Sequence, residues 1–361
     1  MIRSIELVDF RNHRRSVIDL SPGVTAVLGR NGQGKTSLVE AVGFLATLRS
    51  FRGVTHDALV RDGAATAYVR ATVVHSDGRE ILVECEINRT GPNKVLVNRQ
   101  RLPRTRDLLG VVRATVFAPT DLQLVYEGPG ARRDMLDDAL VAVSPRNDAL
   151  VSDVERVLRQ RNALLKQSHG RLDREAAETL DVWDEKLAEV GEALGDARDT
   201  LVADLVPRVR DAYRRLAGTR TPVDMEYSPP WRGAGLAASL AEARDEDVRR
   251  GVTTTGPHRD DVVLRINDMP ARSHASQGET RTLALALRLG IHDLVADAAG
   301  EPPILVLDDV LSELDPLRCA ALLANMPACQ VLITAASPLP DSARCDRVLR
   351  VEAGAVEEEA R

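Results

Sequence analysis

A glycine-rich segment near the start of the chain carries the clearest chemistry in the sequence. Residues 29–36, Gly29-Arg30-Asn31-Gly32-Gln33-Gly34-Lys35-Thr36, fit the pattern G-x-x-x-x-G-K-[ST], and Ser37 follows. The glycines let backbone N–H groups turn inward around phosphate oxygens at the positive end of the next helix. Lys35 supplies a mobile positive charge for the β- and γ-phosphates, and the Thr36 hydroxyl binds Mg²⁺. We therefore predict that residues 29–37 bind ATP together with Mg²⁺.

A second candidate is a pair of carboxylates at the end of an apolar run. Ile304-Leu305-Val306-Leu307 is followed directly by Asp308 and Asp309. Asp308 can hold Mg²⁺ directly or through water, and Asp309 can orient or polarise an attacking water molecule. Alone, this pattern is equally typical of a buried strand that ends in a solvated acidic turn. Together with the phosphate-binding loop it predicts hydrolysis of ATP.

A third segment, Ser276-Gln277-Gly278-Glu279, precedes an apolar helical pattern and supplies a second helix N-terminus for an anion. It resembles the ABC signature, in which a Ser and a Gly contact the γ-phosphate of ATP on the other subunit. Ser276 can equally serve as the helix N-cap, and both roles can coexist. Ser312–Asp315 resembles the D-loop that crosses to the partner. We predict a homodimer, and Lys35, Asp308, Asp309 and Ser276 as catalytic residues.

The composition limits the other possibilities. The chain has 361 residues, 44% hydrophobic and 28% charged, and a formal net charge of −6, so any DNA-binding surface must be local. Its cysteines form no C-x-x-C pair, which argues against structural zinc and a disulfide framework. The first residues alternate like a strand rather than a signal peptide, and no stretch is apolar enough to span a bilayer. We expect a cytoplasmic protein without a membrane partner.

The pattern along the chain indicates a core interrupted by an insertion. Residues 1–125 predict the first part of an ATPase head, with a strand at 24–28, a helix from Lys35 and an antiparallel sheet at 68–75, 81–88 and 95–98. Residues 126–250 predict an inserted helical arm, because two apolar stripes flank a turn at Gly170, with helices of about 50–60 Å. Residues 251–361 predict the rest of the head, with strands at 303–307 and 330–333.

With these motifs in place, the chain resembles the RecF family, bacterial recombinational-repair ATPases related to SMC proteins and ABC ATPases. The resemblance covers essentially the whole chain. Glu279 stands where the family commonly has Gln, and Thr334 stands where transporters carry a switch His. Its most specific parts are Leu7–His13, the phosphate-binding loop, Phe117–Asp137, Thr255–Asp261 and Leu307–Asp315.

The resemblance implies a fold and a function. The fold is an α/β ABC/SMC-type P-loop ATPase head, a mixed sheet with flanking helices and an antiparallel β lobe, plus an inserted helical arm. The function is ATP-driven dimerisation on DNA at single-strand gaps or junctions, with slow ATP hydrolysis as the reset. RecR and RecO would cooperate in placing RecA. Related ATPases also bring an Arg and an Asn toward the nucleotide, here Arg11 and Asn12, with Gly278 in the signature; a solvated turn is the alternative for Arg11 and Asn12.

Other charged residues leave their roles open. Runs of charge are usually solvated faces, so the pattern does not choose among the arginines that could contact DNA phosphates. His258 and Arg259 either neighbour the active site or hold the lobes together. The candidate phosphate contacts are Arg99, Arg101, Arg104, Arg106, Arg132 and Arg133, with Arg156, Arg159 and Arg161 as weaker ones.

Three other functions are disfavoured. An ATP-binding subunit of an ABC transporter would carry a switch His and would lack a helical arm between Lys35 and Ser276. An SMC-type chromosome tether needs coiled coils hundreds of ångströms long, and this arm is far shorter. A P-loop kinase or GTPase does not account for the segment at Ser276, and the N-K-x-D sequence that recognises guanine is absent.

Overall fold

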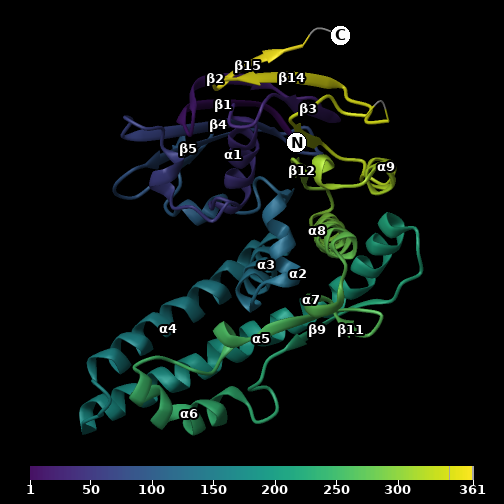
Figure 1. Cartoon of the computed structure of the whole chain (residues 1–361). Helices are drawn as coiled ribbons and strands as arrows, with labels where there is room; N and C mark the ends of the chain where they lie inside the picture. Colours follow the sequence, from purple (N-terminus) through teal and green to yellow (C-terminus); the bar gives the residue numbers. More distant parts are fainter. Residues whose placement is uncertain (341, 360–361) are drawn as a thin grey trace. The chain divides into compact units, whose positions relative to one another are not determined.

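The predicted α/β fold is confirmed by the computed structural model, which describes residues 1–340 and 342–359 (Figure 1). The chain divides into two units, and each contains discontinuous stretches of sequence. Unit 1 comprises residues 1–122, 211–220 and 276–361, and unit 2 comprises residues 123–210 and 221–275. Within the described residues no helix combines the length and the apolar character that crossing a membrane requires.

Unit 1 contains a sheet of six strands in the order β15-β14-β3-β13-β12-β8. All its neighbouring pairs are parallel except β14 and β15, so the carboxyl ends of β3, β12 and β13 meet at one edge. The predicted strands at 24–28, 303–307 and 330–333 are confirmed. The strands are β3 (Val24–Leu28), β8 (Ala114–Phe117), β12 (Ile304–Asp308), β13 (Val331–Ala335), β14 (Arg347–Glu352) and β15 (Ala355–Glu358).

The second sheet of unit 1 is antiparallel throughout, in the order β2-β1-β4-β5-β6-β7. Val69, Val83 and Val95 alternate with more exposed residues and point their side chains into the core, as the period of two predicts. The three predicted strands of this lobe are therefore confirmed. Its strands are β1 (Ile2–Phe10), β2 (His13–Asp19), β4 (Thr66–Val74), β5 (Glu80–Asn88), β6 (Lys94–Val97) and β7 (Gln100–Arg101).

Helix α1 (Lys35–Thr47) lies in the core of unit 1, against strands of both sheets (Figure 1). Leu38, Val39 and Val42 are completely buried, so the helix is fixed by packing on both sides. The other helices of the unit include the long, mostly buried α8. They are η1 (His56–Leu59), η2 (Thr105–Leu108), η3 (Pro119–Leu122), α8 (Gln277–Ala299), η6 (Leu311–Glu313) and α9 (Pro316–Ala324).

Unit 2 is built on two long helices, α4 (Asp148–Gln167) and α5 (Arg174–Ala217), with the predicted turn between them. The 44 residues of α5 span about 66 Å, slightly more than predicted, and its last residues belong to unit 1. A three-stranded antiparallel sheet, β9-β10-β11, completes the unit. The remaining elements are α2 (Gln123–Tyr126), α3 (Pro129–Val143), η4 (Pro145–Asn147), β9 (Val223–Ser228), α6 (Leu236–Arg250), η5 (Pro257–Arg259), β10 (Asp261–Ile266), β11 (Met269–Pro270) and α7 (Ala271–His274).

The inserted unit ends at residue 275 and not at the predicted residue 250, and its sheet is the reason. Strand β10 pairs with β9 along its whole length, from Asp261 opposite Ser228 to Ile266 opposite Val223. Residues 251–275 therefore pack in the inserted unit and not in the ATPase head, to which the predicted boundary at residue 251 assigned them. A strand pattern does not reveal its pairing partner, because pairing is a tertiary choice.

Two arginines that the sequence offered as candidate DNA contacts are instead bonded within unit 2. The guanidinium of Arg132 is buried and donates to Asp261 at 2.7 and 3.0 Å, and the half-buried Arg133 donates to the carbonyl of Asp260 at 2.8 Å. Arg132 is therefore not available to DNA, because its charge is paired with a carboxylate inside the unit. His258 and Arg259 also stay within unit 2, where both approach the carbonyl of Thr253.

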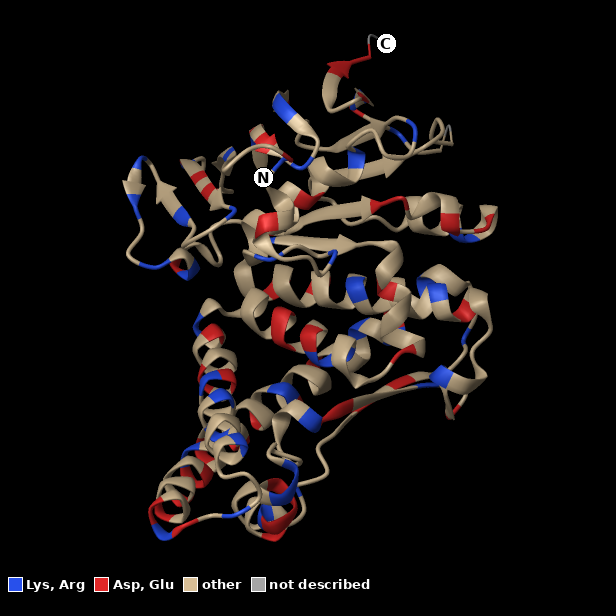
Figure 2. Ribbon diagram, turned by 60° about the vertical axis from the view of Figure 1, so that its left-hand side comes forward, with Lys and Arg blue, Asp and Glu red and all other residues tan. Residues whose placement is uncertain are grey.

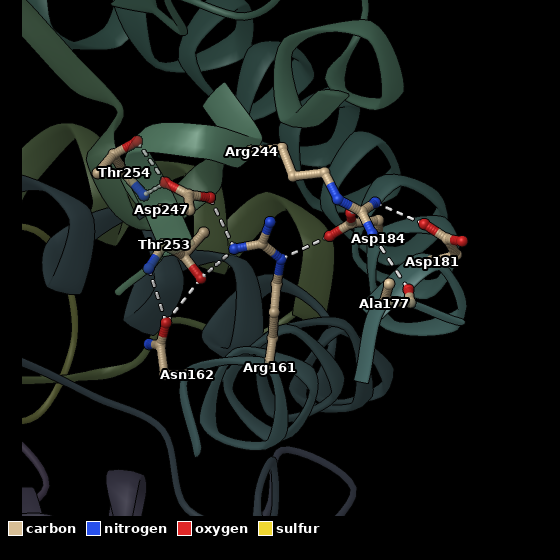
Figure 3. Close-up of polar contacts among 9 residues, drawn as sticks. All are labelled: Arg161, Asn162, Ala177, Asp181, Asp184, Arg244, Asp247, Thr253 and Thr254. Atoms are coloured by element: carbon tan, nitrogen blue, oxygen red, sulfur yellow. Dashed lines mark hydrogen bonds and ion pairs between the residues drawn. The ribbon is translucent and has the colours of Figure 1, made fainter. Parts of the chain in front are cut away.

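Arg161, one of the weaker candidates, is likewise not available to DNA, because it is fully buried at the centre of a polar network (Figure 3). It donates to Asp184 of α5 at 2.7 Å and to the fully buried Asp247 of α6 at 2.7 Å. A third bond, of 2.8 Å, joins Arg161 to the hydroxyl of Thr253. One side chain from α4 thereby bonds two further helices and the loop after α6.

Removing this guanidinium should destabilise unit 2 strongly. Arg161→Met leaves Asp184 and Asp247 without their shared partner, and breaking a buried ion pair in this way costs about 3–5 kcal/mol. Arg244→Met is the matched control, because Arg244 also bonds Asp184 but is partly exposed, and its loss should cost about 1 kcal/mol or less. Urea unfolding of the two variants measures the difference. Equal free energies of unfolding would show that the Arg161 network does not hold these helices.

Candidate functional site

The phosphate-binding loop joins β3 to α1, as predicted, and two of its glycines, Gly29 and Gly34, are closely packed. A Cβ atom at Gly29 would lie 2.4 Å from the carbonyl oxygen of Val351. Gly34 has φ +122°, and a Cβ there would meet Asn12 and His13 within 3 Å. Only glycine fits these positions. The amino group of Lys35 turns back into the loop and donates to the carbonyls of Gly29 at 2.6 Å and Arg30 at 3.1 Å.

A cavity of about 640 Å³ opens over this loop, within the range of ligand sites. Most of the predicted nucleotide-binding residues line it, together with Asp309. Gly29, Arg30 and Gln33 are not among its lining residues. The predicted residues that line it are Arg11, Asn12, Asn31, Gly32, Gly34, Lys35, Thr36, Ser37 and Asp309.

Asp308 connects the end of β12 to the phosphate-binding loop. Its Oδ1 accepts a hydrogen bond from the hydroxyl of Thr36 at 3.0 Å and another from Thr334 at 2.7 Å. Burial raises the pKa of the Asp308 carboxyl, the two hydroxyl hydrogen bonds lower it, and the neighbouring Asp309 raises it; the net direction is upward. The carboxylate is thus held in a protein interior that favours its neutral form.

Asp309 takes a different conformation from its neighbour. Its φ of 53° is in the left-handed region, which is uncommon for residues other than glycine. The backbone N–H donates to the hydroxyl of Thr334 at 2.9 Å, and Oδ1 accepts from Ser312 at 3.0 Å. Thr334, at the end of β13, therefore bonds both consecutive carboxylate residues. The sequence had shown Thr334 only as the absence of a switch His.

Arg11 and Asn12 form the turn between β1 and β2, and both line the cavity. The guanidinium of Arg11 is already bonded: to the fully buried Glu40 at 2.6 and 2.8 Å and to the carbonyl of Ala58 at 2.8 Å. Asn12 donates to the carbonyl of Gln33 at 2.8 Å. A nucleotide that used the Arg11 charge would compete with Glu40 for it.

The segment at Ser276 begins α8, and Ser276 is its N-cap. The hydroxyl accepts from the N–H of Glu279 at 3.3 Å, while the Glu279 carboxylate accepts from the N–H of Ser276 at 2.8 Å. This capping box confirms the structural role of Ser276. Ser276 is exposed, and neither it nor Gly278 is among the residues that line the cavity over the same chain's phosphate-binding loop.

The start of α8 is also tied to the segment after Asp309. Arg281 bonds Glu313 at 2.9 Å, and Arg318 donates to the hydroxyl of Thr282 at 2.9 Å. A Cβ at Gly278 would lie 3.0 Å from the guanidinium of Arg318. The first turns of α8 and the segment from Glu313 to Arg318 are therefore bonded to each other within one chain.

Sequence reasoning missed one wall of the cavity. Arg52, Asp57, Asp62 and Arg89 line it; the first three come from the segment between α1 and β4, which includes η1, and Arg89 follows β5. Arg52 lies within 4.0 Å of Glu40, the same carboxylate that bonds Arg11. Their only signal in the sequence was charge within turns, which is also the signature of ordinary solvated loops.

Comparison with known proteins gives a consistent result. The family described as RecF/RecN/SMC N terminal domain matches residues 1–355. The DNA replication and repair protein RecF of Streptomyces avermitilis is 46% identical over 352 residues, which cover 93% of this chain and 93% of that protein. The RecF of Cutibacterium acnes is 42% identical over 376 residues, which cover 96% and 95%.

Solved structures agree with the family that these relatives indicate. One described as the recombination mediator protein RecF with ATP in the RecFOR pathway has a TM-score of 0.91 and 29% identity, covering 99% of this chain and 97% of that one. An Smc head domain from Pyrococcus furiosus has a TM-score of 0.58 at 14% identity, covering 99% of this chain and 95% of that one, so it shows the shared fold alone.

Replacing Asp308 with Asn should stabilise the nucleotide-free protein near neutral pH. Because the native pKa of this carboxyl is raised, stability is lost as the pH rises through that pKa, and an uncharged amide avoids the loss. Urea unfolding between about pH 4 and pH 8 should show an advantage for Asp308→Asn that appears as the pH rises. Asp309→Asn, at a less buried position, is the control. If Asp308→Asn is no more stable than the original chain at neutral pH, the pKa of Asp308 is not raised in the folded protein.

Proposed function

The chain belongs to the RecF family of DNA replication and repair proteins, and we propose that it is an ATP-switched DNA-binding protein whose nucleotide site is completed by a second copy. One observation carries the proposal. The Thr36 hydroxyl of the phosphate-binding loop and the carboxylate of Asp308 are 3.0 Å apart, at the edge of a cavity that Lys35 and Asp309 line. Residues separated by 272 positions thus meet as an ATPase requires.

In the proposed site the loop and Lys35 bind the phosphates, and Thr36 with Asp308 holds Mg²⁺. These two side chains offer hard oxygen ligands, and adjacent ligands at about 2.1 Å in octahedral geometry are about 3.0 Å apart, which fits the distance between them. Bound Mg²⁺ would neutralise charge on the β- and γ-phosphates. It would also favour the ionised form of Asp308, which burial alone disfavours.

Asp309 is the proposed water-positioning residue. Its carboxylate lines the cavity, and its backbone is fixed by Thr334 while its side chain is fixed by Ser312. Such restraint suits a group that must orient a water molecule rather than bind the nucleotide. We infer that hydrolysis is slow and resets the switch, as the family resemblance implies.

The second copy would supply Ser276 and Gly278. Their helix N-terminus is exposed on the chain that carries it, and N–H groups at a helix start attract anions. In a dimer this end of α8 would approach the γ-phosphate bound to the partner. Its links to Glu313 and Arg318 would carry the segment after Asp309 into the same interface.

DNA is the proposed macromolecular partner, at single-strand gaps or junctions, together with RecR and RecO in placing RecA. Relatives named DNA replication and repair proteins, and a structure described within the RecFOR pathway, support this. Figure 2 shows basic and acidic residues interspersed along the ribbon, so binding must use a local surface. Arg99 and Arg101, at the exposed β6–β7 hairpin, remain available, whereas Arg132 and Arg161 are buried.

Substituting Ser276 with Arg should separate ATP binding from dimerisation. The side chain would fill the closing interface, whereas the phosphate-binding loop of the same chain would be untouched. Calorimetry should give an ATP affinity within about twofold of the original chain, while sedimentation should show no ATP-dependent dimer. Ser276→Thr, which keeps the N-cap, is the control. ATP-dependent dimerisation of Ser276→Arg at normal affinity would refute the shared site.

Reversing the charge of Arg99 and Arg101 should weaken DNA binding. If each contacts one phosphate, Arg99→Glu/Arg101→Glu should lower affinity at least tenfold and flatten the plot of log affinity against log salt by about two units. Arg249→Glu/Arg250→Glu changes the formal charge equally, at exposed residues of α6, and serves as the control. Fluorescence anisotropy on gapped duplex DNA measures both. Equal salt slopes for the two double variants would show that the β6–β7 hairpin does not contact DNA.

A further inference from the structure

Two turns of unit 1 converge behind the second half of the phosphate-binding loop. The turn between β14 and β15 donates the N–H of Gly354 to the Gln33 carbonyl at 2.9 Å and the N–H of Ala353 to the Gln33 side chain at 2.6 Å. From the turn between β1 and β2, Asn12 donates to the same Gln33 carbonyl at 2.8 Å. The ring of His13, which is fully buried, reaches the carbonyl of Gly34 at 3.0 Å.

The turns are also linked to each other. The hydroxyl of Ser16 lies 2.9 Å from His13 Nδ1 and 2.9 Å from the carbonyl oxygen of Gly354, so its single hydrogen serves one of the two acceptors. A carbonyl only accepts, so the bond to Gly34 requires the His13 proton on Nε2. Burial lowers the pKa of His13, which favours a neutral ring, and in this tautomer Nδ1 accepts from Ser16.

There is no spare room between these segments. A Cβ atom added to Gly354 would lie 2.4 Å from the carbonyl oxygen of Asn12 and 3.4 Å from the Cα of His13. The φ of Gly354 is +81°, so the turn needs glycine both for its conformation and for the close approach. The β14–β15 turn is therefore pressed against the β1–β2 turn.

These contacts decide where two backbone N–H groups point. A planar trans peptide directs the carbonyl of one residue and the N–H of the next in opposite directions. Holding the Gln33 carbonyl outward therefore turns the Gly34 N–H inward. The Gly34 carbonyl accepts from His13 and also from the N–H of Leu38 in α1 at 3.0 Å, and together these two bonds direct the Lys35 N–H. The first half of the loop is different, because the carbonyls of Gly29 and Arg30 accept from Lys35 itself.

We propose that His13 is a positioning residue for phosphate binding and that the β14–β15 turn is part of the nucleotide site. Through Gln33, Gly34 and Ser16 the two turns preset the N–H groups of Gly34 and Lys35 toward the phosphates before nucleotide arrives. A Gly-rich loop is otherwise flexible, and preorganised donors bind an anion without an ordering cost. This inference rests on the proposed function, since it assigns these N–H groups to phosphates.

The test compares substitutions at His13 that keep or remove the donor. His13→Leu removes it, and ATP binding measured by calorimetry should weaken about three- to tenfold, the effect of one hydrogen bond. His13→Gln carries its amide nitrogen near the position of Nε2 and should restore most of the affinity. Thermal unfolding reports whether the fold is intact. A His13→Leu protein that is folded and binds ATP as tightly as the original chain overturns the proposal.

A pair of glycine substitutions tests the β14–β15 turn separately. Gly354→Ala should weaken ATP binding, because its methyl group would push the turn away from Asn12. Gly78→Ala is the matched control: Gly78 has φ +83°, close to that of Gly354, but an added Cβ would meet nothing within 4 Å. Equal ATP affinities for the two alanine variants would show that the turn does not act on the loop.

A crystal structure of His13→Leu without nucleotide distinguishes failure of the positioning role from failure of the proposed function. A turned Gly34–Lys35 peptide would support the positioning role whether or not ATP binds. An unchanged peptide would overturn it. If the original chain binds no ATP at all, the proposed function fails, and the peptide orientation still decides whether His13 positions the loop.

Discussion

The buried carboxylate of Asp308 is the constraint on which the rest of unit 1 depends. A parallel sheet brings the carboxyl ends of β3, β12 and β13 to one edge, so the phosphate-binding loop, Asp308 and Thr334 must meet there. The hydroxyls of Thr36 and Thr334 satisfy the Asp308 oxygen that would otherwise be unpaired. Burial makes the Asp308 charge costly, and Mg²⁺ in the proposed site would make it favourable. On this proposal, the site sacrifices stability of the nucleotide-free protein for chemistry.

Much of this site could be predicted from sequence because its signals are local. The loop, the helix from Lys35 and the capping residues at Ser276 depend on residues within a few positions of each other. The rest depends on partners far along the chain. In the sequence Arg132 and Arg161 look like surface charges. Their partners, Asp261 and Asp247, lie in distant segments, and no neighbouring residue predicts these pairs. The predicted boundary at residue 251 failed for the same reason, since β10 pairs with β9 of the inserted unit.

The two units are stabilised by different interactions, because unit 2 contains buried arginines. Unit 1 is held by an apolar core around α1, whereas unit 2 adds ion pairs between its elements: Arg132 joins α3 to β10, Arg161 joins α4 to α6, and Arg198 joins α5 to α3. Such pairs gain little over an apolar core, but they strongly penalise any arrangement in which a charge is left alone. Aromatic residues make up only 3% of the chain, so polar contacts carry part of the packing specificity that large rings often supply.

The proposed function depends on a nucleotide site that two chains share. The most direct measurement crosslinks Asn31 of one chain to Ser276 of another, after both are changed to Cys and Cys329 and Cys345 to Ser. A short bifunctional thiol reagent would join only residues that come close together. With ATP and Mg²⁺ the account predicts a covalent dimer, and with ADP it predicts little. No covalent dimer at saturating ATP, or equal yields with ATP and ADP, would contradict it.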